Sequence, residues 1–115
     1  MSKSKFSTYN DGAVFIYKEK PKRSSFAAKE NVSVLEDMDF IIRLDFEQVA
    51  KRQQDMEFAE QMGFSLSMKL KTRYIPTIKS KYKAVINNYL YDVAYIDDDR
   101  KEMWLYLEGV RALDT

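Results

Sequence analysis

The clearest pattern in the chain is an alternation of apolar and polar residues with a period of two, through residues 39–46 and again through residues 64–72. Successive side chains of a strand point to opposite faces of a sheet, so this period indicates two strands, each with one buried face. The apolar faces hold Phe40, Ile42, Leu44 and Phe46 in the first segment and Phe64, Leu66, Met68 and Leu70 in the second.

Four further segments rich in β-branched and aromatic residues are predicted to be strands. They are residues 13–20, 82–86, 89–96 and 102–108. Asn87 and Asn88 separate two of them, and asparagine tolerates the positive φ of a tight hairpin turn. A second polar turn, residues 97–101, precedes the last strand. The final three strands are therefore predicted to form an antiparallel meander.

The period changes to that of a helix between residues 46 and 62. One face of this segment carries Phe46, Val49, Ala50, Met56, Ala59 and Met62. Asp45, followed three residues later by Gln48, resembles a capping box, and Gly63 suits the left-handed residue that ends many helices. One helix is therefore predicted over residues 46–62.

These elements predict a mainly β fold: a small antiparallel β-barrel of about six strands with one inserted helix. The length of 115 residues suits a single domain. We expect a core at residues 11–111, preceded by a flexible N-terminal arm at residues 1–10. Residues 21–31 form a long polar loop. Amide hydrogens of the arm and this loop are expected to exchange rapidly.

The composition removes most catalytic chemistry. The chain has no cysteine and no histidine, so it lacks disulfides, thiolate metal ligands and the commonest general base. Its three glycines lie too far apart in sequence to form a phosphate-binding loop. The run 97–99 lacks the glycine and terminal glutamate of a calcium loop, which favours a solvated turn. We expect no enzymatic activity, no cofactor, no metal and no small-molecule substrate.

The net charge of +1 gives no overall reason to expect a nucleic acid or a membrane as partner, but the charges are unevenly placed. Residues 18–29 and 69–83 are basic, whereas the C-terminal part is acidic. Opposite poles suit head-to-tail contacts that close a ring, although unrelated surface charge is the plain alternative. The candidate residues are Lys69, Lys71, Lys79 and Lys81 on one side and Asp97, Asp98 and Glu102 on the other.

Aromatic residues are concentrated in the last two hairpins, where both faces of the strands are apolar or amphipathic. Tyrosine and tryptophan are favoured where one end of the side chain is buried and the other is wet, as at subunit interfaces. Trp104 is therefore a candidate interface residue, with a place in the core as the alternative. The lysines of residues 69–83, interleaved with tyrosines, are also typical of a single-strand nucleic-acid binder.

Four segments carry a resemblance to a known family: residues 51–61 (KRQQDMEFAEQ), 68–72 (MKLKT), 89–93 (YLYDV) and 103–107 (MWLYL). Together they resemble the head–tail adaptor, or head-closure, proteins of tailed siphophages and their prophages in Gram-positive bacteria. The resemblance covers residues 11–111, and residues 21–36 have no counterpart in the family pattern.

The resemblance implies a small β-barrel that forms a ring under the portal and connector after DNA packaging. The ring would retain the genome and offer the surface to which the tail attaches. The implied partners are further copies of the chain, portal and connector proteins, tail-completion or tail proteins, and packaged DNA in the channel. The implied location is the neck of the virion, with the host cytoplasm before assembly.

Family members place the segment between the second and third main strands near the channel, and residues 45–63 correspond to it. The residues of this segment that lie off the apolar helix face are the expected partner contacts: Arg52, Gln53, Gln54, Phe58 and Gln61. Two other functions stay open. One is a tail-completion or tail-terminator protein of the same neck, and the other is a small single-strand nucleic-acid-binding barrel, which would bind oligonucleotides with strong salt dependence.

Overall fold

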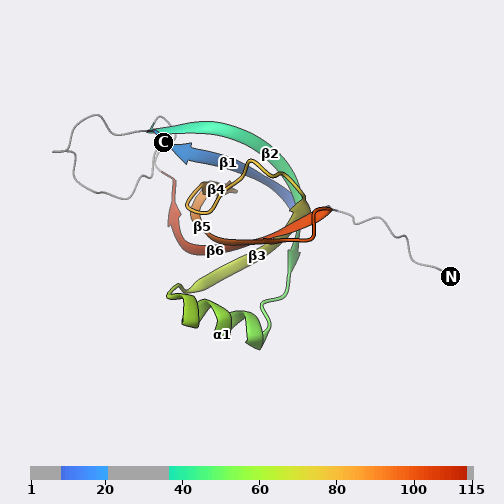
Figure 1. Ribbon diagram of the computed structural model, residues 1–115. Coiled ribbons are helices and arrows are strands. Elements are labelled where there is room, and N and C mark those ends of the chain that lie inside the picture. The colour runs from blue at the N-terminus through green and yellow to red at the C-terminus, as the bar shows by residue number, and fades with distance from the viewer. Residues whose placement is uncertain (1–8, 21–36, 114–115) are drawn as a thin grey trace.

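The computed structural model describes residues 9–20 and 37–113, and the expectations for residues 1–8 and 21–36 lie outside this part of the chain. It is mainly β with one helix, as predicted (Figure 1). The elements are β1 (Gly12–Glu19), β2 (Met38–Val49), α1 (Gln53–Met62), β3 (Leu66–Arg73), β4 (Lys83–Ile86), β5 (Tyr89–Asp98) and β6 (Glu102–Ala112). Within these residues, no helix has the length and apolar character needed to cross a membrane.

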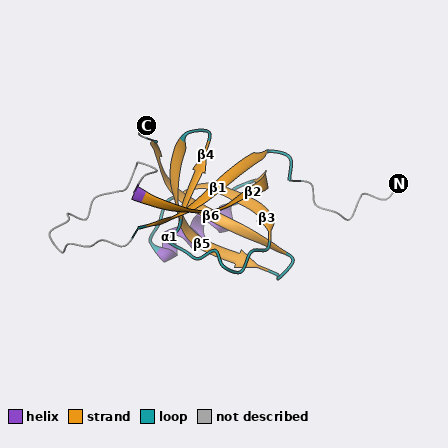
Figure 2. Ribbon diagram, turned by 90° about the horizontal axis from the view of Figure 1, so that it is seen from above, coloured by secondary structure: helices purple, strands orange, loops and turns teal. Residues whose placement is uncertain are grey.

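The six strands form one antiparallel sheet that closes on itself in a ring, hereafter the closed sheet (Figures 1 and 2). Its order is β1-β2-β3-β6-β5-β4, and β4 returns to pair with β1. Three residue pairs complete this return: Phe15 with Val85, Ile16 with Ala84, and Tyr17 with Lys83. The helix α1 sits between β2 and β3 in the sequence and lies outside the closed sheet (Figure 1).

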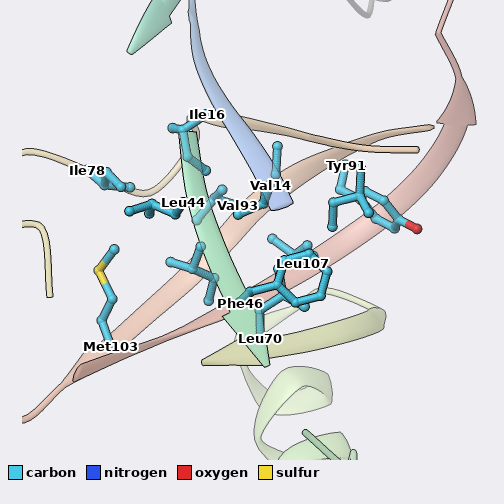
Figure 3. Close-up of a cluster of buried hydrophobic side chains, with 13 residues drawn as sticks. Val14, Ile16, Leu44, Phe46, Leu70, Ile78, Tyr91, Val93, Met103 and Leu107 are labelled. Carbon is cyan, nitrogen blue, oxygen red and sulfur yellow. The ribbon is translucent and has the colours of Figure 1, made fainter. Parts of the chain in front are cut away.

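The interior of the closed sheet is a single apolar core to which every strand contributes (Figure 3). Ile16, Leu70, Leu105 and Leu107 have no exposed surface. Each fully buried side chain of this size stabilises the fold by about 1.5–3 kcal/mol relative to exposure. The core residues are Val14, Ile16, Leu44, Phe46, Leu70, Ile78, Ala84, Ile86, Tyr91, Val93, Met103, Leu105 and Leu107.

The predicted meander of β4, β5 and β6 is confirmed with its first turn, but the second turn is shorter than the predicted residues 97–101, because β5 continues to Asp98. Asn87 and Asn88 have φ angles of 50° and 70°, the left-handed conformation that a tight hairpin turn requires. In the second turn the Asp99 carboxylate accepts hydrogen bonds from the backbone N–H groups of Lys101 and Glu102 at 2.9 and 2.8 Å. All three acidic residues are exposed; Asp97 and Asp98 end β5, opposite Trp104 and Met103, and Asp99 begins the turn.

The predicted helix of residues 46–62 is wrong in its first part. Strand β2 continues to Val49, because its last three residues pair with Lys69, Leu70 and Lys71 of β3. The helix begins at Gln53, after the backbone N–H of Arg52 donates a hydrogen bond to the Asp55 carboxylate at 3.0 Å. Its end agrees with the prediction, since Gly63 has a φ of 89° and its N–H bonds back to the last turn.

The predicted inward position of Phe40 is also wrong, because an irregularity in β2 reverses its face. Ile16 pairs with Ile42, but the next residue, Tyr17, pairs with Phe40, which leaves Ile41 as an extra residue. Such a bulge adds one residue to the strand, so Phe40, on its far side from Leu44, points to the other face of the sheet. Phe40 is therefore 55% exposed, whereas Leu44 and Phe46 stay in the core. A similar shift in β3 places Leu66 on the outer face of the sheet, where it is buried against Ala59 of α1.

This placement predicts a contrast between two positions of the same strand. Leu44→Ala is expected to lower the free energy of unfolding by about 2–5 kcal/mol, because it leaves a cavity in the core. Phe40→Ala is expected to cost less than about 1 kcal/mol, since it removes only a cross-strand aromatic contact. Urea denaturation of both variants measures the difference, and equal losses would place Phe40 inside the sheet.

Candidate protein-interaction site

The helix α1 is held on the outer wall formed by β3, β6 and β5. Ala59, Leu66 and Tyr106 are buried where the helix meets this wall. Phe58 meets the Tyr95 ring edge to face, with centroids 4.8 Å apart, and the Tyr106 ring at 5.9 Å. Tyr95 and Tyr106 are themselves 5.4 Å apart. Edge-to-face rings add about 0.5–1.5 kcal/mol beyond their buried area, so this trio fixes the helix on the sheet.

An ion pair beside the aromatic trio ties the first turn of α1 to β3. The Lys69 Nζ lies 3.0 Å from the Asp55 Oδ1, and their side chains are 15% and 10% exposed. The same ammonium lies 5.0 Å from the centroid of the Tyr106 ring. Burial raises the pKa of the Asp55 carboxyl, but the Arg52 N–H and the Lys69 ammonium together lower that pKa below its usual value. Asp55 therefore both begins the helix and anchors it.

The predicted contact residues of the helix fall into two groups. Arg52, Gln53, Gln54 and Gln61 are exposed, as expected for partner contacts. Phe58 was expected to lie off the apolar face, but it packs against the sheet. The helix starts at Gln53 and turns the face made by Asp55, Phe58 and Ala59 toward β3 and β6. Met56 and Met62 were predicted to lie on the buried apolar face of the helix, but they are 44% and 56% exposed.

The residues expected to form a charged seam between subunits fall into two groups, one engaged in ion pairs within the molecule and one exposed. Lys69 is engaged by Asp55, and the Lys71 ammonium lies 3.2 Å from Glu47 and 3.9 Å from Glu102. Glu102 also accepts a hydrogen bond from the Tyr9 hydroxyl at 2.8 Å. The members of the seam that are exposed to solvent are Lys79, Lys81, Asp97 and Asp98.

A shallow cavity of about 290 Å³ lies between the end of β2 and the wall strands. Trp104, half-buried, lines it together with three cations. Two of these cations, Lys69 and Lys71, are neutralised by Asp55, Glu47 and Glu102. The cavity is lined by Val49, Ala50, Arg52, Lys69, Lys71 and Trp104. Its local charge is close to balanced, so it offers little attraction to a phosphate.

A second cavity, of about 410 Å³, lies between the end of α1 and the segment 80–83. Its wall contains a network in which the Asp92 carboxylate lies 2.7 Å from the Lys83 Nζ and 3.6 Å from Arg111. Lys83 also lies 4.0 Å from Glu19, so the network joins β1, β4, β5 and β6. The sequence contained a signal for it, because a two-residue turn at Asn87 and Asn88 places Lys83 directly opposite Asp92.

The outer face of β1 and β2 carries a feature that the sequence did not predict, a surface cluster of three aromatic rings that we call the aromatic patch. It consists of Phe15 and Tyr17 of β1 and Phe40 of β2. The Phe40 ring lies 6.4 Å from Phe15 and 5.5 Å from Tyr17 between centroids. Phe15 is 37% exposed and Phe40 is 55% exposed. The bulge at Ile41 creates the patch, and a bulge has no local sequence signature here.

Within the described residues, no three potential ligands among aspartate, glutamate, histidine and cysteine gather as a metal site would require. The sequence matches no model of a known protein family, and it matches no curated protein. What this chain does is therefore inferred from its own residues.

The role of Asp55 predicts a pH-dependent stability. Its pKa is lower in the folded protein than in the unfolded chain, so its contribution is complete above the ordinary value of 3.8 and is lost as the pH falls through the lowered folded value. Asp55→Asn is expected to cost about 1–3 kcal/mol at neutral pH, because it removes one partner of a buried contact.

Urea denaturation at several pH values checks this, and the gap between wild type and Asp55→Asn should shrink in acid. Glu57→Gln is the matched control, since it removes an exposed carboxylate from the same helix and should cost less than about 0.5 kcal/mol. A gap that stays constant into strong acid would contradict the anchoring role of the Asp55 charge.

Proposed function

We propose that this chain is a structural assembly protein of a phage neck, a head-closure or head–tail adaptor subunit. Its closed sheet would serve as the small β-barrel of a ring that docks on the portal and connector and offers the tail its attachment surface. The observation that carries the proposal is the insertion of residues 50–65 between β2 and β3, which holds α1 on the outside of the sheet. The resemblance assigns this segment to the channel side of the ring.

The way α1 is attached supports a binding role. A binding surface is most effective when the element that carries it is held rigidly, because less entropy is then lost on association. The Asp55–Lys69 ion pair and the ring of Phe58 fix one side of the helix on the sheet. The other side leaves long polar side chains free to meet a partner: Arg52, Gln53, Gln54 and Gln61.

The buried polar groups also support a non-catalytic role. Only Asp55 and Thr72 are buried polar residues in the part of the chain that the structure describes. Asp55 is held by Arg52 and Lys69, and the Thr72 hydroxyl donates a hydrogen bond to the Arg73 carbonyl at 3.0 Å. Both groups thus have structural partners, whereas a catalytic group needs access to a substrate.

Charge has a smaller part in the proposed ring than the sequence suggested. The exposed members of the charged seam do not lie at opposite poles, because the Lys81 N–H bonds to the carbonyl of Val93, on the same strand as Asp97. Exposed ion pairs contribute about 0.2–1 kcal/mol each. The contacts of the proposed ring therefore depend mainly on uncharged surfaces.

The nucleic-acid alternative is the weaker of the candidate functions. Affinity for single strands comes from uncompensated cations beside stacking platforms. Here the cations nearest Trp104 are matched by carboxylates of the same molecule. Lys79 and Lys81 are exposed, but they lie on a loop with no role in the cavity of Trp104.

The proposal is tested with heads of the phage or prophage that encodes the chain, prepared with this gene disrupted. Purified protein is expected to dock on the connector, retain the packaged DNA and restore tail attachment, as seen by electron microscopy and nuclease protection. Docking of Gln54→Ala/Gln61→Ala should weaken by on the order of tenfold, because interface contacts are lost. The control Thr77→Ala/Lys101→Ala changes exposed residues elsewhere and should dock normally.

Three results would contradict the proposal. Binding to tail tubes instead of heads would favour a tail-completion or tail-terminator protein. Salt-dependent binding of oligonucleotides, without binding to heads, would favour the nucleic-acid alternative. Normal activity of heads that never received the protein would remove the neck role altogether.

A further inference from the structure

Strand β2 has a main-chain edge that the closed sheet leaves without a partner strand. On one side, β2 pairs with β1 from Met38 to Phe46. On the other side, it pairs with β3 only at residues 47–49, because its N-terminal part curves away over the sheet while β3 continues beside β6 (Figure 1). None of the described strands pairs with this second side of residues 42–46, which we call the open edge.

Two hydrogen bonds fix which main-chain groups the open edge presents. The Phe46 carbonyl accepts a hydrogen bond from the Asp11 N–H at 2.9 Å, and the Gln48 N–H donates one to the Asp11 carboxylate at 2.8 Å. Asp11 directly precedes β1, so the even-numbered residues in this part of β2 direct their main-chain groups toward β1. Because these groups alternate between the two sides of a strand, those of Arg43 and Asp45 point to the open edge.

The main-chain groups at the open edge are accessible to a partner. No backbone hydrogen bond from the turns and loops that the structure describes reaches Arg43 or Asp45. Buried main-chain groups are almost always hydrogen-bonded, so these groups face water. Both residues are exposed, whereas Leu44 between them lies in the core.

The open edge also lacks the usual protection against pairing. Natural sheets protect a free edge with lysine, proline or a bulge. Residues 42–46 (IRLDF) contain no lysine or proline, and the bulge at Ile41 lies beyond them. The Arg43 side chain lies 3.2 Å from that of Asp45, so their two charges compensate each other. The open edge is therefore regular and carries no net charge.

We propose that the open edge binds an extended segment of another polypeptide by β-strand addition. The N–H and C=O groups of Arg43 and Asp45 bond to alternate residues of the segment. Residues 42–46 extend over roughly 17 Å, which a segment of about five residues matches. Side chains of the segment beside Arg43 and Asp45 are polar, since they share the exposed outer face. The open edge exists whether or not the chain acts in a phage neck.

The probe is a displayed library of random peptides of about eight residues, the length of an ordinary strand, selected against the full-length protein. Asp45→Pro removes one N–H from the open edge, and an edge strand tolerates proline where the N–H faces solvent. Selected peptides are expected to bind this variant on the order of tenfold more weakly, because a peptide carbonyl loses its donor. Asp45→Ala keeps the N–H and should weaken binding less than about threefold, since only an exposed ion pair is lost.

Hydrogen exchange of the wild-type protein gives a second measurement that needs no variant. A bound peptide is expected to slow exchange at the amides of Arg43 and Asp45, whereas the amide of Leu44, which faces β1, is slow from the start. Arg43→Pro, with Arg43→Ala as its control, replaces Asp45→Pro if the latter fails to fold by circular dichroism.

Strand addition at the open edge would be overturned by a selection that yields no binding peptide. Peptides that bind Asp45→Pro as tightly as wild type, or that leave exchange at Arg43 and Asp45 unchanged, would overturn it as well. A wild-type dimer that Asp45→Pro abolishes would assign the edge to a second copy instead. None of these results bears on docking to heads, so the neck function stands or falls separately.

Discussion

The pairing of β4 with β1 is the constraint on which the rest of the structure depends. Only three residue pairs make this contact, yet they turn a six-stranded sheet into a ring. Ile16 and Ala84, at the centre of the contact, are completely buried. Closure gives all six strands one shared core and fills the interior with side chains.

The outer wall divides into regions with different tasks. Around Lys83 and around Lys69, charges are matched within the molecule and hold strands and helix together. Phe15 and Phe40 of the aromatic patch are exposed on the outer face of β1 and β2. Lys69 and Lys71, which the charge pattern of the sequence assigned to a contact between subunits, pair with carboxylates of the same molecule. Several of the most prominent lysines serve the fold itself.

Features set by neighbouring residues could be predicted from the sequence. The hairpin at Asn87 and Asn88 and the end of the helix at Gly63 follow from local backbone preferences, and both are confirmed. The register of that hairpin also implied the contact of Lys83 with Asp92. At the candidate site, the exposure of Arg52, Gln53, Gln54 and Gln61 was predicted correctly, whereas Phe58 was placed on the wrong side of the helix.

Features set by distant residues could not be predicted. Residues 47–49 have a helical pattern, but pairing with β3 keeps them in a strand. The bulge at Ile41 depends on how β1 meets β2 across a long separation in sequence, and it decides that Phe40 faces outward. The aromatic patch follows from that bulge, so the alternating pattern of residues 39–46 could not predict it.

The measurement that tests the account most directly is an electron cryo-microscopy reconstruction of the neck of a particle that carries this protein. The account predicts a ring of copies of this chain beneath the connector. A neck that lacks the chain, or that holds it only on the tail tube, would contradict the proposed function.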